Sequence, residues 1–479
     1  MEKQKYTREG LIHLCKTQPE AAADLILLLL DRIDKLEARV IELEIALNKN
    51  SQNSHKSPFS DGYRRNIQSG TVKNKKQRPT GGQTGHPGTT LRKSINIDHV
   101  VLHPARTCIG CGSSLEHVPV QAVQTRQVFD LPAVKMEVTE HRSEEKQCPC
   151  CHTKTSGIFP KGVTKATQYG ATIKSIVLYM MQHQIIPFER TTEFLQDIFG
   201  CALSEGTLKN WIAEAHRHLA QTEEQIKEQL QQAPILHVDE TGMFCENKLH
   251  WIHIASTDIY THYGIHSKRG KEAMDEIGIL PKATGRIIHD FWESYARYDH
   301  LTHAYCNAHI VRELRSVYED YHQSWAQKLI DLLFHIKEKI ETKPISKNFV
   351  TRSVHRYDTL LQSGFRLNRT NRGSPHKRGR VKQSKTRNLL NRLHEHRDEV
   401  LAFLFDPTVP FTNNLAERDL RMVKVKHKIS GTFRCHHGAL SYCRIRGYIS
   451  TMKKQGVNIL SALSSIFAGI PLSPIPQLR

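Results

Sequence analysis

Three acidic side chains, widely separated in the chain, have the chemistry needed to hold divalent metal ions. Asp239 follows the apolar run ILHV, Asp290 follows the run GRIIH, and Glu417 lies in FTNNLAERDLR. Two Mg²⁺ (or Mn²⁺) ions about 3.5–4 Å apart need shared carboxylate oxygens, with one ion on the attacking oxygen and the other on the leaving oxygen. We therefore expect Asp239, Asp290 and Glu417 to form a metal site for phosphodiester chemistry.

Position along the expected elements separates these acids from others in the chain. Asp290 ends an apolar strand, whereas Asp258 lies at an expected hairpin turn, Asp275 on a helix face and Asp299 beyond the strand. Glu417 has a structural alternative. Asn414 and Glu417 have the N-cap to N3 spacing of a capping box, so the carboxylate could close a helix start instead of holding a metal.

Basic residues dominate the chain and gather after Glu417. Lys and Arg number 68 against 48 Asp and Glu, a formal charge of +20 over 479 residues, and such a surplus favours a polyanionic partner. We expect DNA contacts from the residues that follow Glu417, with an exposed basic helix as the alternative. These residues are Arg418, Arg421, Lys424, Lys426 and Lys428.

Two C-x-x-C pairs predict a structural zinc site. Cys108 and Cys111 form the first pair, Cys148 and Cys151 the second, and two such knuckles can arrange four thiolates around Zn²⁺. Cys150 is a spare thiol that could replace either neighbour. The runs RQVFDL and VKMEVTEH are expected to form a hairpin between the pairs, and unrelated buried cysteines are the alternative.

The elements around the acids predict an RNase H-like core. ILHVDETG, LHWIHIAS and DIYTHYGIH are three strand candidates, followed by a helix near Lys271 to Ile279 and the strand GRIIHD. Three antiparallel strands, a crossover helix and a further strand begin such a fold. A basic loop, RLNRTNRGSPHKRGRVKQSKTR, lies in an expected helical insertion between the second and third acids and could clamp DNA.

Helical patterns surround this core. Apolar residues alternate at spacings of four and three from Leu29 to Leu47, which is typical of a coiled coil that joins identical chains. A single amphipathic helix packed on its own protein is the alternative. Two helices separated by GCALSEG have the outline of a helix-turn-helix, with Thr207 and Lys209 on the second helix as DNA-contact candidates. Such helical pairs also occur without any role in DNA binding.

Cys306 and His309 form a C-x-x-H sequence after the second acid. Together with His300 and His303 they recur every third residue, but an ideal helix rotates each step by about 60°, so the four cannot all face one ion. We expect Cys306 and His309 to brace the site or lie near the substrate, with a second zinc site as the alternative.

The chain resembles DDE transposases of the insertion-sequence 66 family. The matching stretches include NKNSQNSHKSPFSDG, GGQTGHPG, the two C-x-x-C pairs, HVDETG, HDFWESY with YCNAHIVREL, and NNLAERDLRMVKVKHKISGTFR. The resemblance implies an RNase H-like core, magnesium dependence, and cleavage and joining of mobile-element ends. It places Asp239, Asp290 and Glu417 on the three acids. The zinc segment and the region from Asp320 to Phe405 match only loosely.

The expected organisation is a multidomain α+β protein. Its parts are a coiled-coil helix (1–50), a basic linker (51–100), a zinc-binding module (101–160), a helix-turn-helix-like domain (161–228), the core in two parts (229–318 and 409–440), a helical insertion (319–408) and a helical tail (441–479). Terminal inverted repeats and target DNA are the expected partners, with possible accessory proteins of the same element. The absence of a signal peptide or a membrane-length apolar run indicates a cytoplasmic, nucleoid-associated protein.

Two other functions fit the same residues. A non-catalytic DNA-binding protein derived from a transposase would bind ends without cutting them. A structure-specific nuclease on the RNase H-like fold would cut branched DNA irrespective of the repeat sequence. The sequence determines neither the terminal repeat nor the target-site preference.

Overall fold

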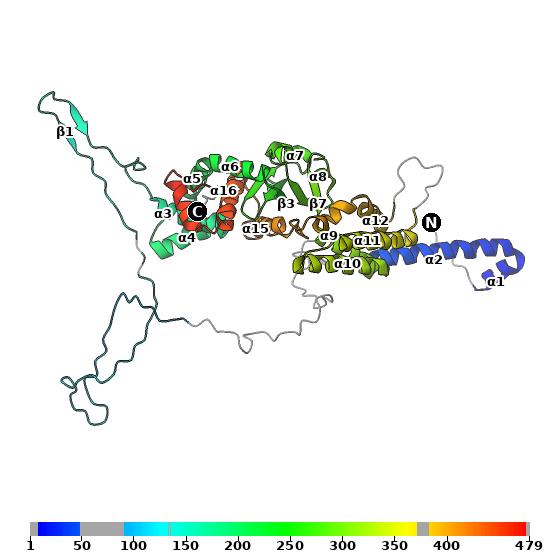
Figure 1. Cartoon of the computed structure of the whole chain (residues 1–479), viewed down its shortest axis with the longest axis horizontal. Coiled ribbons are helices and arrows are strands. Elements are labelled where there is room, and N and C mark those ends of the chain that lie inside the picture. Colours follow the sequence, from blue (N-terminus) through cyan, green and yellow to red (C-terminus); the bar gives the residue numbers. More distant parts are fainter. Residues whose placement is uncertain (1–7, 48–90, 133, 135, 371–382, 476–479) are drawn as a thin grey trace. The chain divides into compact units, whose positions relative to one another are not determined.

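A five-stranded sheet forms the centre of the structure, which is a computed structural model (Figure 1). Its strands are β3 (Ile235–Cys245), β4 (Lys248–Ser256), β5 (Thr261–His266), β6 (Arg286–His289) and β7 (Thr302–Tyr305). The order is β5-β4-β3-β6-β7, antiparallel among the first three and parallel from β3 to β7. The four predicted strands are confirmed; β7 was not predicted.

The structure describes residues 8–47, 91–132, 134, 136–370 and 383–475. They fall into two units, one formed by residues 65–140 and 195–201 and the other by residues 1–64, 141–194 and 202–479. The sheet and all three candidate acids belong to the second unit. Most of the expected linker and residues 371–382 of the basic loop lie outside the described residues.

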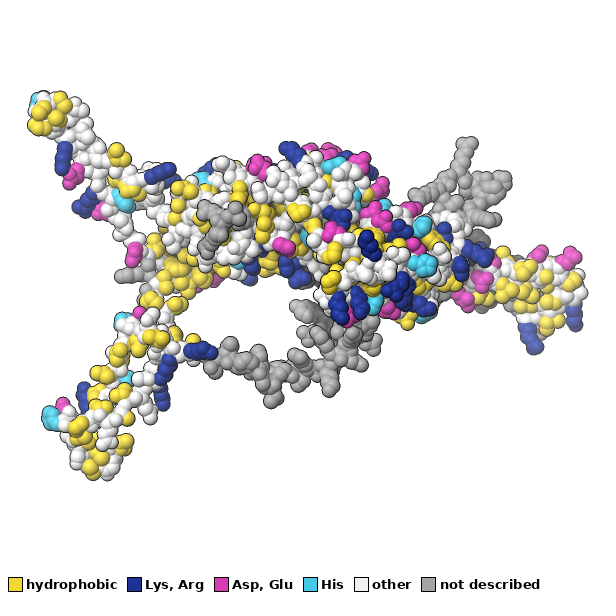
Figure 2. Space-filling view, in the orientation of Figure 1, with side chains coloured by type: hydrophobic (Ala, Val, Ile, Leu, Met, Phe, Trp, Pro, Cys, Tyr) yellow, Lys and Arg dark blue, Asp and Glu magenta, His cyan; other side chains and the backbone are white. Residues whose placement is uncertain are grey.

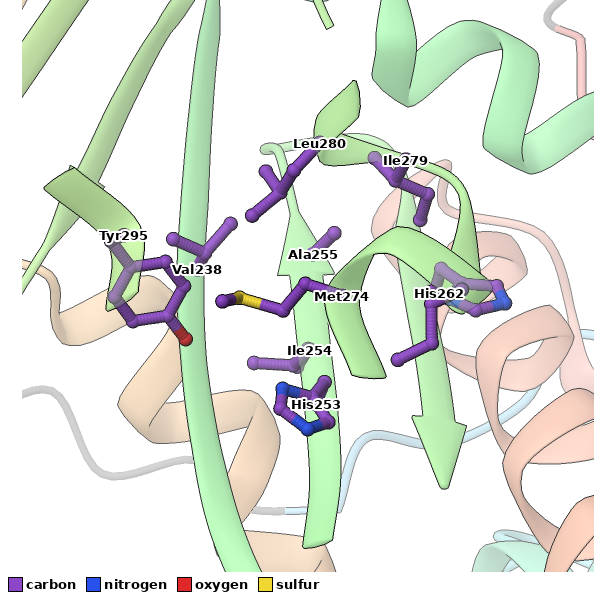
Figure 3. Close-up of a pocket in the computed structure, with 10 residues that line it drawn as sticks. Val238, His253, Ile254, Ala255, His262, Met274, Ile279, Leu280 and Tyr295 are labelled. Atoms are coloured by element: carbon purple, nitrogen blue, oxygen red, sulfur yellow. The ribbon is translucent and has the colours of Figure 1, made fainter. Parts of the chain in front are cut away.

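Helices α6 (Ala220–Gln231), α7 (Lys271–Ile277) and α8 (Glu293–Ala296) accompany one face of the sheet. Val238, Ala255 and Met274 are buried in the same apolar cluster, as alternation along β3 and β4 requires. The side chains leave a cavity of about 20 Å³ lined by residues such as Val238, His253 and Tyr295 (Figure 3). That volume suits about one water molecule, so this cavity is part of the core and holds no larger ligand.

Helices α15 (Asn414–Ser430) and α16 (His436–Lys454) cover the opposite face of β3, β4 and β5. Ile254 and Tyr263 from the sheet and Leu420 from α15 are buried together there. A buried ion pair fixes the two helices, because Lys454 Nζ donates to Asp419 at 2.7 Å and to Ser256 Oγ at 2.7 Å. Since Asp419 is two residues after Glu417, this pair also fixes the helix that carries the third acid.

Gly285 allows β6 to start close beside β3. A Cβ at this position would overlap with the carbonyl oxygens of Ala233 and Pro234, so no other residue fits without moving the backbone. The Arg286 amide donates to the Pro234 carbonyl at 2.9 Å, and the parallel pairing of β3 and β6 begins there. This close approach places the end of β6, and Asp290 after it, beside β3.

The predicted insertion is helical throughout its described residues. It contains α10 (Ser324–Thr342), α11 (Lys347–Leu367), α12 (Lys385–Glu395), α13 (Arg397–Val400) and α14 (Ala402–Phe405), and it follows α9 (Asn307–Tyr321). Its helices share one apolar cluster with Ile288 of β6 and Tyr305 of β7. Tyr357 O–H donates to the Leu393 carbonyl at 2.8 Å and ties α11 to α12. The insertion therefore packs directly on the parallel half of the sheet.

The region before the sheet contains α3 (Ala171–Leu178), a π-helical turn (Tyr179–His183), α4 (Phe188–Phe199) and α5 (Glu205–His218). Helix α5 begins after Ser204, whose side chain accepts from the Thr207 amide, as the sequence predicts. The C-terminal helix α17 (Ile459–Phe467) contacts α3 and α5. Helix α6 runs across the expected boundary at 228/229, and helix α16 runs across the one at 440/441. Helix α16 therefore joins the C-terminal tail to the second part of the core.

Two helices, α1 (Arg8–Thr17) and α2 (Pro19–Leu47), form the N-terminal region. The predicted coiled-coil segment is helical, and Ile33 and Leu36 of its apolar seam are 50% and 59% exposed. Figure 2 shows apolar side chains along these helices. Among the helices that the structure describes, none is both long and apolar enough to cross a membrane.

The segment between the cysteine pairs differs from the prediction. In its described residues RQVFDL and VKMEVTEH form no strands, and Val128, Leu131 and Val138 are exposed. The short hairpin β1 (Glu145–Gln147) and β2 (Lys154–Ser156) instead surrounds the second cysteine pair. The predicted hairpin is wrong because apolar alternation forms a strand only where a partner strand and a core receive the side chains.

Candidate active site

The three predicted acids come from three elements of the core. Asp239 lies inside β3, opposite Ile254 of β4, and the expectation that it ends a strand is wrong because β3 continues to Cys245 in the hairpin with β4. Asp290 follows β6 directly, as predicted, and its Oδ1 accepts from the Trp292 amide at 2.9 Å. Glu417 lies in the first turns of α15.

The negative charges of the other two acids act on Asp239. Burial raises the pKa of Asp239 well above its ordinary value, and the negative charges of Glu240, Asp290 and Glu417 raise it further. A hydrogen bond from the Glu240 amide to Asp239 Oδ1, 2.8 Å, opposes this only in part. Carboxylates that repel one another in a half-buried place are stabilised when a cation joins them.

The start of α15 removes the capping alternative for Glu417. The helix begins at Asn414, so Asn413 occupies the cap position, and no side-chain cap bond is made there. Asn413 instead binds β3: its Nδ2 donates to the Val238 carbonyl and its Oδ1 meets His237 Nδ1, both at 2.8 Å. Glu417 Oε1 has no hydrogen-bond partner among the described residues and is left to other ligands.

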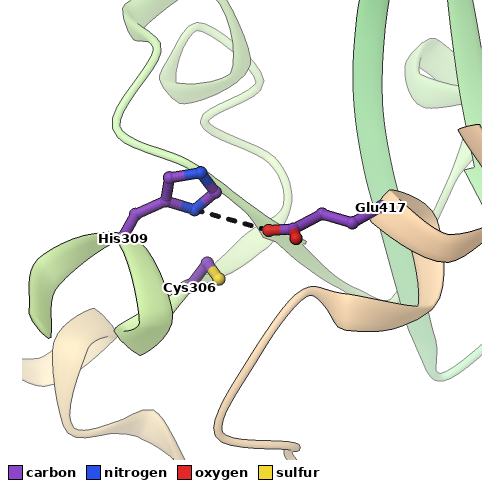
Figure 4. Close-up of side chains that lie close together, drawn as sticks. All are labelled: Cys306, His309 and Glu417. Carbon is purple, nitrogen blue, oxygen red and sulfur yellow. Dashed lines mark ion pairs between the residues drawn. The ribbon is translucent and has the colours of Figure 1, made fainter. Parts of the chain in front are cut away.

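Cys306 and His309 lie beside Glu417 (Figure 4). One ligand atom from each of the three lies within 4.8 Å of the others, and His309 Nδ1 is 3.8 Å from Glu417 Oε1. Cys306 Sγ accepts from the Asn413 amide at 3.1 Å, and burial raises the pKa of this thiol to about 11. The bond from Asn413 to Cys306 Sγ is in keeping with the predicted bracing role for Cys306.

The four residues spaced by three, from His300 to His309, do not lie on one helix. His303 belongs to β7, Cys306 directly precedes α9, and His309 lies in the first turn of α9. The strand and the helix start therefore separate His303 from His309, and a helix through all four residues is excluded. His303 instead hydrogen-bonds to His289 of β6, Nδ1 to Nε2, at 2.9 Å.

The basic residues of α15 divide between two sides of the helix. Arg421, Lys424 and Lys428 follow Glu417 at spacings of four, three and four, so they share its face. Lys426 is nine residues from Glu417, about half a turn away, and its ammonium lies over the rings of Phe433 and Tyr442 at 5.0 and 5.5 Å. Burial lowers the Lys426 pKa to about 8, and this side chain belongs to the packing between α15 and α16.

Lys426 is therefore left out of the DNA-facing set that the sequence indicated. Arg418 and Arg421 are exposed beside Glu417. On α5, Thr207 shares the cap with Ser204 and the exposed Lys209 lies over the Phe188 ring at 5.7 Å. Thr207 and Lys209 remain predictions.

A fourth acid, Glu240, was missed by the sequence reasoning. Its side chain is 2% exposed and points away from Asp239, as alternation along β3 requires. Arg269 donates to Glu240 Oε1 through Nε (2.9 Å) and Nη2 (2.6 Å), and Tyr295 O–H donates to Oε2 at 2.5 Å. Burial raises the pKa of Glu240, although the bonds from Tyr295 and Arg269 lower it in part.

The helical insertion also places a side chain, Arg392, beside the second acid. Arg392 of α12 lies over the ring of Phe291, the residue after Asp290, at 4.6 Å, and it is paired with Glu313 of α9. The sequence carried no signal for these contacts, because they join residues that are far apart in the chain. Their local patterns are those of ordinary exposed helices.

The two cysteine knuckles have the same local geometry. The Cys108 amide donates to the Ser113 carbonyl, and the Cys108 carbonyl accepts from the Gly112 amide. Cys148 makes the same two bonds with Thr153 and His152, and all four are 2.9 Å long. The shared pattern aligns Cys108 with Cys148 and Cys111 with Cys151. Cys150 aligns with Gly110 and therefore has no counterpart in the first knuckle.

The second cysteine of each knuckle is prepared for deprotonation. Cys111 hydrogen-bonds to the Ser113 hydroxyl and Cys151 to the Thr153 hydroxyl, both at 3.3 Å. These bonds lower the pKa of Cys111 and lower that of Cys151 to about 7. Zinc binds thiolates, so both knuckles fit this metal. The two knuckles belong to different units of the chain.

The sheet order and the acids on β3, after β6 and on α15 are typical of an RNase H-like DDE catalytic domain. A sequence profile described as "Transposase IS66 family" matches residues 166–441, more than half of the chain. The chain belongs to this family and is a DDE transposase. Its expected RNase H-like core and DNA-processing function are confirmed.

Two shorter profiles match the N-terminal part. One is described as the zinc-finger binding domain of transposase IS66 and covers residues 105–152, which confirms a zinc-finger domain there. The other is a family of unknown function over residues 14–92. The expected zinc cofactor agrees with the first profile, and the divalent-metal cofactor agrees with the DDE class.

Two curated relatives come from Sinorhizobium fredii. The uncharacterized protein y4hP is 23% identical over 428 residues, which is 80% of this chain and 74% of the relative. The uncharacterized protein y4jO is 37% identical over 70 residues, 15% of this chain and 22% of the relative. The first likeness extends over most of both chains, in keeping with one shared domain organisation.

Proposed function

We propose that Asp239, Asp290 and Glu417 bind Mg²⁺ or Mn²⁺ and catalyse cleavage of the mobile element's DNA ends and their transfer to target DNA. The observations that carry this proposal are the places of Asp239 within β3, of Asp290 directly after β6 and of Glu417 in the first turn of α15, together with the charges of Asp290 and Glu417, which both raise the pKa of Asp239. Bound divalent ions would supply activation of the attacking oxygen and neutralisation of the leaving oxygen.

The donor set suits hard cations. All three side chains offer carboxylate oxygens, the ligands that magnesium and manganese prefer. Asp239 Oδ1 and Asp290 Oδ1 each accept one backbone amide, which orients the carboxylates and leaves their second oxygens available. Glu417 Oε1 is buried without a hydrogen-bond partner among the described residues, as expected for an atom that awaits a ligand.

The surrounding residues hold the acids and the DNA. Asn413 and Cys306 fix the start of α15 against β3 and α9. Arg418, Arg421, Lys424 and Lys428 lie along α15 on or next to the Glu417 face and bind backbone phosphates. Hydrolysis frees a 3′-hydroxyl at the element end, and this hydroxyl attacks the target strand at the same acids.

Other parts recognise and pair the ends. Cys108, Cys111, Cys148 and Cys151 bind structural zinc, and Thr207 and Lys209 of α5 contact terminal repeats. The coiled coil of α2 joins protomers across two ends, and accessory proteins of the same element assist. The transposase works on the bacterial nucleoid.

The test uses DNA that carries the element's own ends. Asp239→Asn, Asp290→Asn and Glu417→Gln should each lower metal-dependent cleavage by at least about 10³-fold while end binding in a gel-shift assay stays within about threefold. Asp299→Asn is the matched control, because this exposed acid lies near the core but outside the cluster. Near-normal cleavage by the Glu417→Gln protein would refute the assignment.

A further inference from the structure

Arg269 is held in one orientation next to the acid cluster. It lies in the loop between β5 and α7, and its guanidinium is over the rings of Trp251, at 4.7 Å, and Trp292, at 4.3 Å. Nε and Nη2 both donate to Glu240 Oε1. Two aromatic contacts and two charge-assisted hydrogen bonds leave this long side chain little rotational freedom.

The contacts of Arg269 lead to the first two catalytic acids. Glu240 is the neighbour of Asp239 on β3, and its other oxygen accepts from Tyr295. Trp292 follows Asp290 by two residues, and its amide donates to Asp290 Oδ1. Arg269 therefore binds the residue next to Asp239 on β3, and it is linked to Asp290 through Trp292.

Part of the guanidinium is still available. The Arg269 side chain is 41% exposed, whereas the Glu240 side chain that it binds is 2% exposed. Within the part of the chain that the structure describes, no acceptor binds Arg269 Nη1. An arginine that only neutralised Glu240 could be buried with it, but this one keeps part of its side chain exposed, and its Nη1 binds no acceptor among the described residues.

The cluster also has an electrostatic requirement. Asp239, Asp290 and Glu417 place three carboxylates in this part of the core, and they repel the phosphates of an approaching DNA strand. The basic residues of α15 lie on the Asp239 face of the sheet, while Arg269 lies on the Glu240 face. A cation on this second side would hold the strand where the acids alone would repel it.

We propose that Arg269 binds a backbone phosphate next to the scissile bond through Nη1, the guanidinium nitrogen that does not bind Glu240. This inference rests on the proposed cleavage function. Trp251, Trp292 and Glu240 act as positioning residues that aim the guanidinium. The ligand is a phosphodiester anion of the bound DNA, which the planar arginine fork contacts independently of base sequence.

The experiment compares substrates that each carry one neutral methylphosphonate linkage near the cleavage site. With the wild-type protein, one flanking position should reduce the cleavage rate about tenfold, the effect of one charge-assisted hydrogen bond. Arg269→Ala should reduce cleavage of unmodified DNA about tenfold and should show no further loss at that position. Equal sensitivity of both proteins at every position would overturn the proposal.

Control variants separate this contact from folding and from general charge. Lys268→Ala removes a neighbouring exposed charge that pairs with Glu272, and it should keep the wild-type pattern of sensitivity. Glu240→Gln removes the charge that positions Arg269, so it should reduce the loss of activity at the sensitive position. If Arg269→Ala lowers the melting temperature, Arg269→Gln, which retains a hydrogen-bond donor for Glu240, takes its place in the same comparison.

The two proposals fail in different ways. If the wild-type protein makes no metal-dependent cut in DNA with its own ends, the cleavage function is wrong. If the wild-type protein cuts but loses no activity with any neutral linkage, or if Arg269→Ala and wild type lose activity at the same positions, only the role of Arg269 is wrong.

Discussion

At the residue scale, the Asn413 side chain connects the third acid to the first. It is 2% exposed, and its amide binds both the Val238 carbonyl and His237 on the strand that carries Asp239. Replacing it with Ala leaves those two buried groups without partners, and each such loss costs about 1–3 kcal/mol. Asn413→Ala should therefore lower the free energy of unfolding by about 2–4 kcal/mol, measured by urea denaturation.

The same change should reduce activity more than binding. Without Asn413 the start of α15 is less firmly held, so Glu417 spends less time beside Asp239, and cleavage should fall at least about tenfold. Asn414→Ala serves as the control, because Asn414 is the exposed first residue of α15 next to Asn413. Equal stability of Asn413→Ala and Asn414→Ala would show that the two bonds to β3 contribute nothing.

Glu223 of α6 makes the free energy of unfolding depend on pH. Burial opposes its ionisation, but His262 (3.4 Å) and Arg444 (2.6 Å) outweigh burial and lower the pKa of Glu223 to about 2 from an ordinary 4.5. A depressed folded-state pKa adds stability that is complete above about pH 4.5 and is lost as the pH falls toward 2. Glu223→Gln should cost about 2 kcal/mol at pH 7.

Denaturation at several pH values tests this sign. The difference between wild type and Glu223→Gln should shrink as the pH falls below about 4.5, where the carboxyl group of the unfolded chain takes up its proton. Glu224→Gln is the control, since its carboxylate is 63% exposed and paired only with Lys227, and it should change stability by less than about 0.5 kcal/mol. A difference that stays the same at pH 4 and pH 7 would contradict the assigned pKa.

At the element scale, the sequence predicted what local patterns determine. Alternating apolar residues identified β3 to β6, and Ser204 identified the start of α5, because these signals lie within each segment. The short strand β7 was missed, since four residues give too little periodicity. The strands predicted at RQVFDL and VKMEVTEH did not form, because strand formation depends on partners that a local pattern cannot show.

For the candidate site too, the sequence predicted the main residues but not their contacts. Residue type, position and resemblance identified Asp239, Asp290 and Glu417, and the position of Asp239 inside β3 followed only from its pairing with β4. Glu240 and Arg269 were missed because their contact joins residues 29 positions apart. The side of α15 that each lysine occupies could be read from spacing, but the burial of Lys426 needed the aromatic residues of the next segment.

The matching knuckles give a prediction about zinc. Because Cys151 aligns with Cys111 and Cys150 has no counterpart, Cys151→Ser should lower bound zinc well below about one ion per chain, whereas Cys150→Ser should not. Metal content of the purified protein, measured by atomic emission, tests this directly. Loss of zinc in the Cys150→Ser protein, with retention in Cys151→Ser, would reverse the ligand assignment.

At the scale of the whole molecule, the surplus of 20 positive charges is distributed over several elements. In the proposed arrangement the basic face of α15 and Arg269 lie on two sides of the three acids, so attraction of the DNA backbone and metal-assisted chemistry would occupy adjacent surfaces. The zinc-finger region and α5 add further basic or polar surface outside the core. Such a division suits a transposase, which must hold its DNA ends before and after each cut.

The exposed seam of α2 predicts an oligomer. Ile33 and Leu36 are central a and d positions, and both are at least half exposed on the single chain, so a second copy would bury them. Leu36→Asp would place a charge in that seam and should reduce the mass measured by light scattering to that of a single chain. Joining of paired ends should fall at least about tenfold, because both ends must be held together, while binding of one end stays within about threefold.

Asp34→Ala, on the outer face of the same helix, should leave mass and joining unchanged. Wild-type protein that already has the mass of one chain, both free and on paired ends, would exclude the α2 seam as the joining surface.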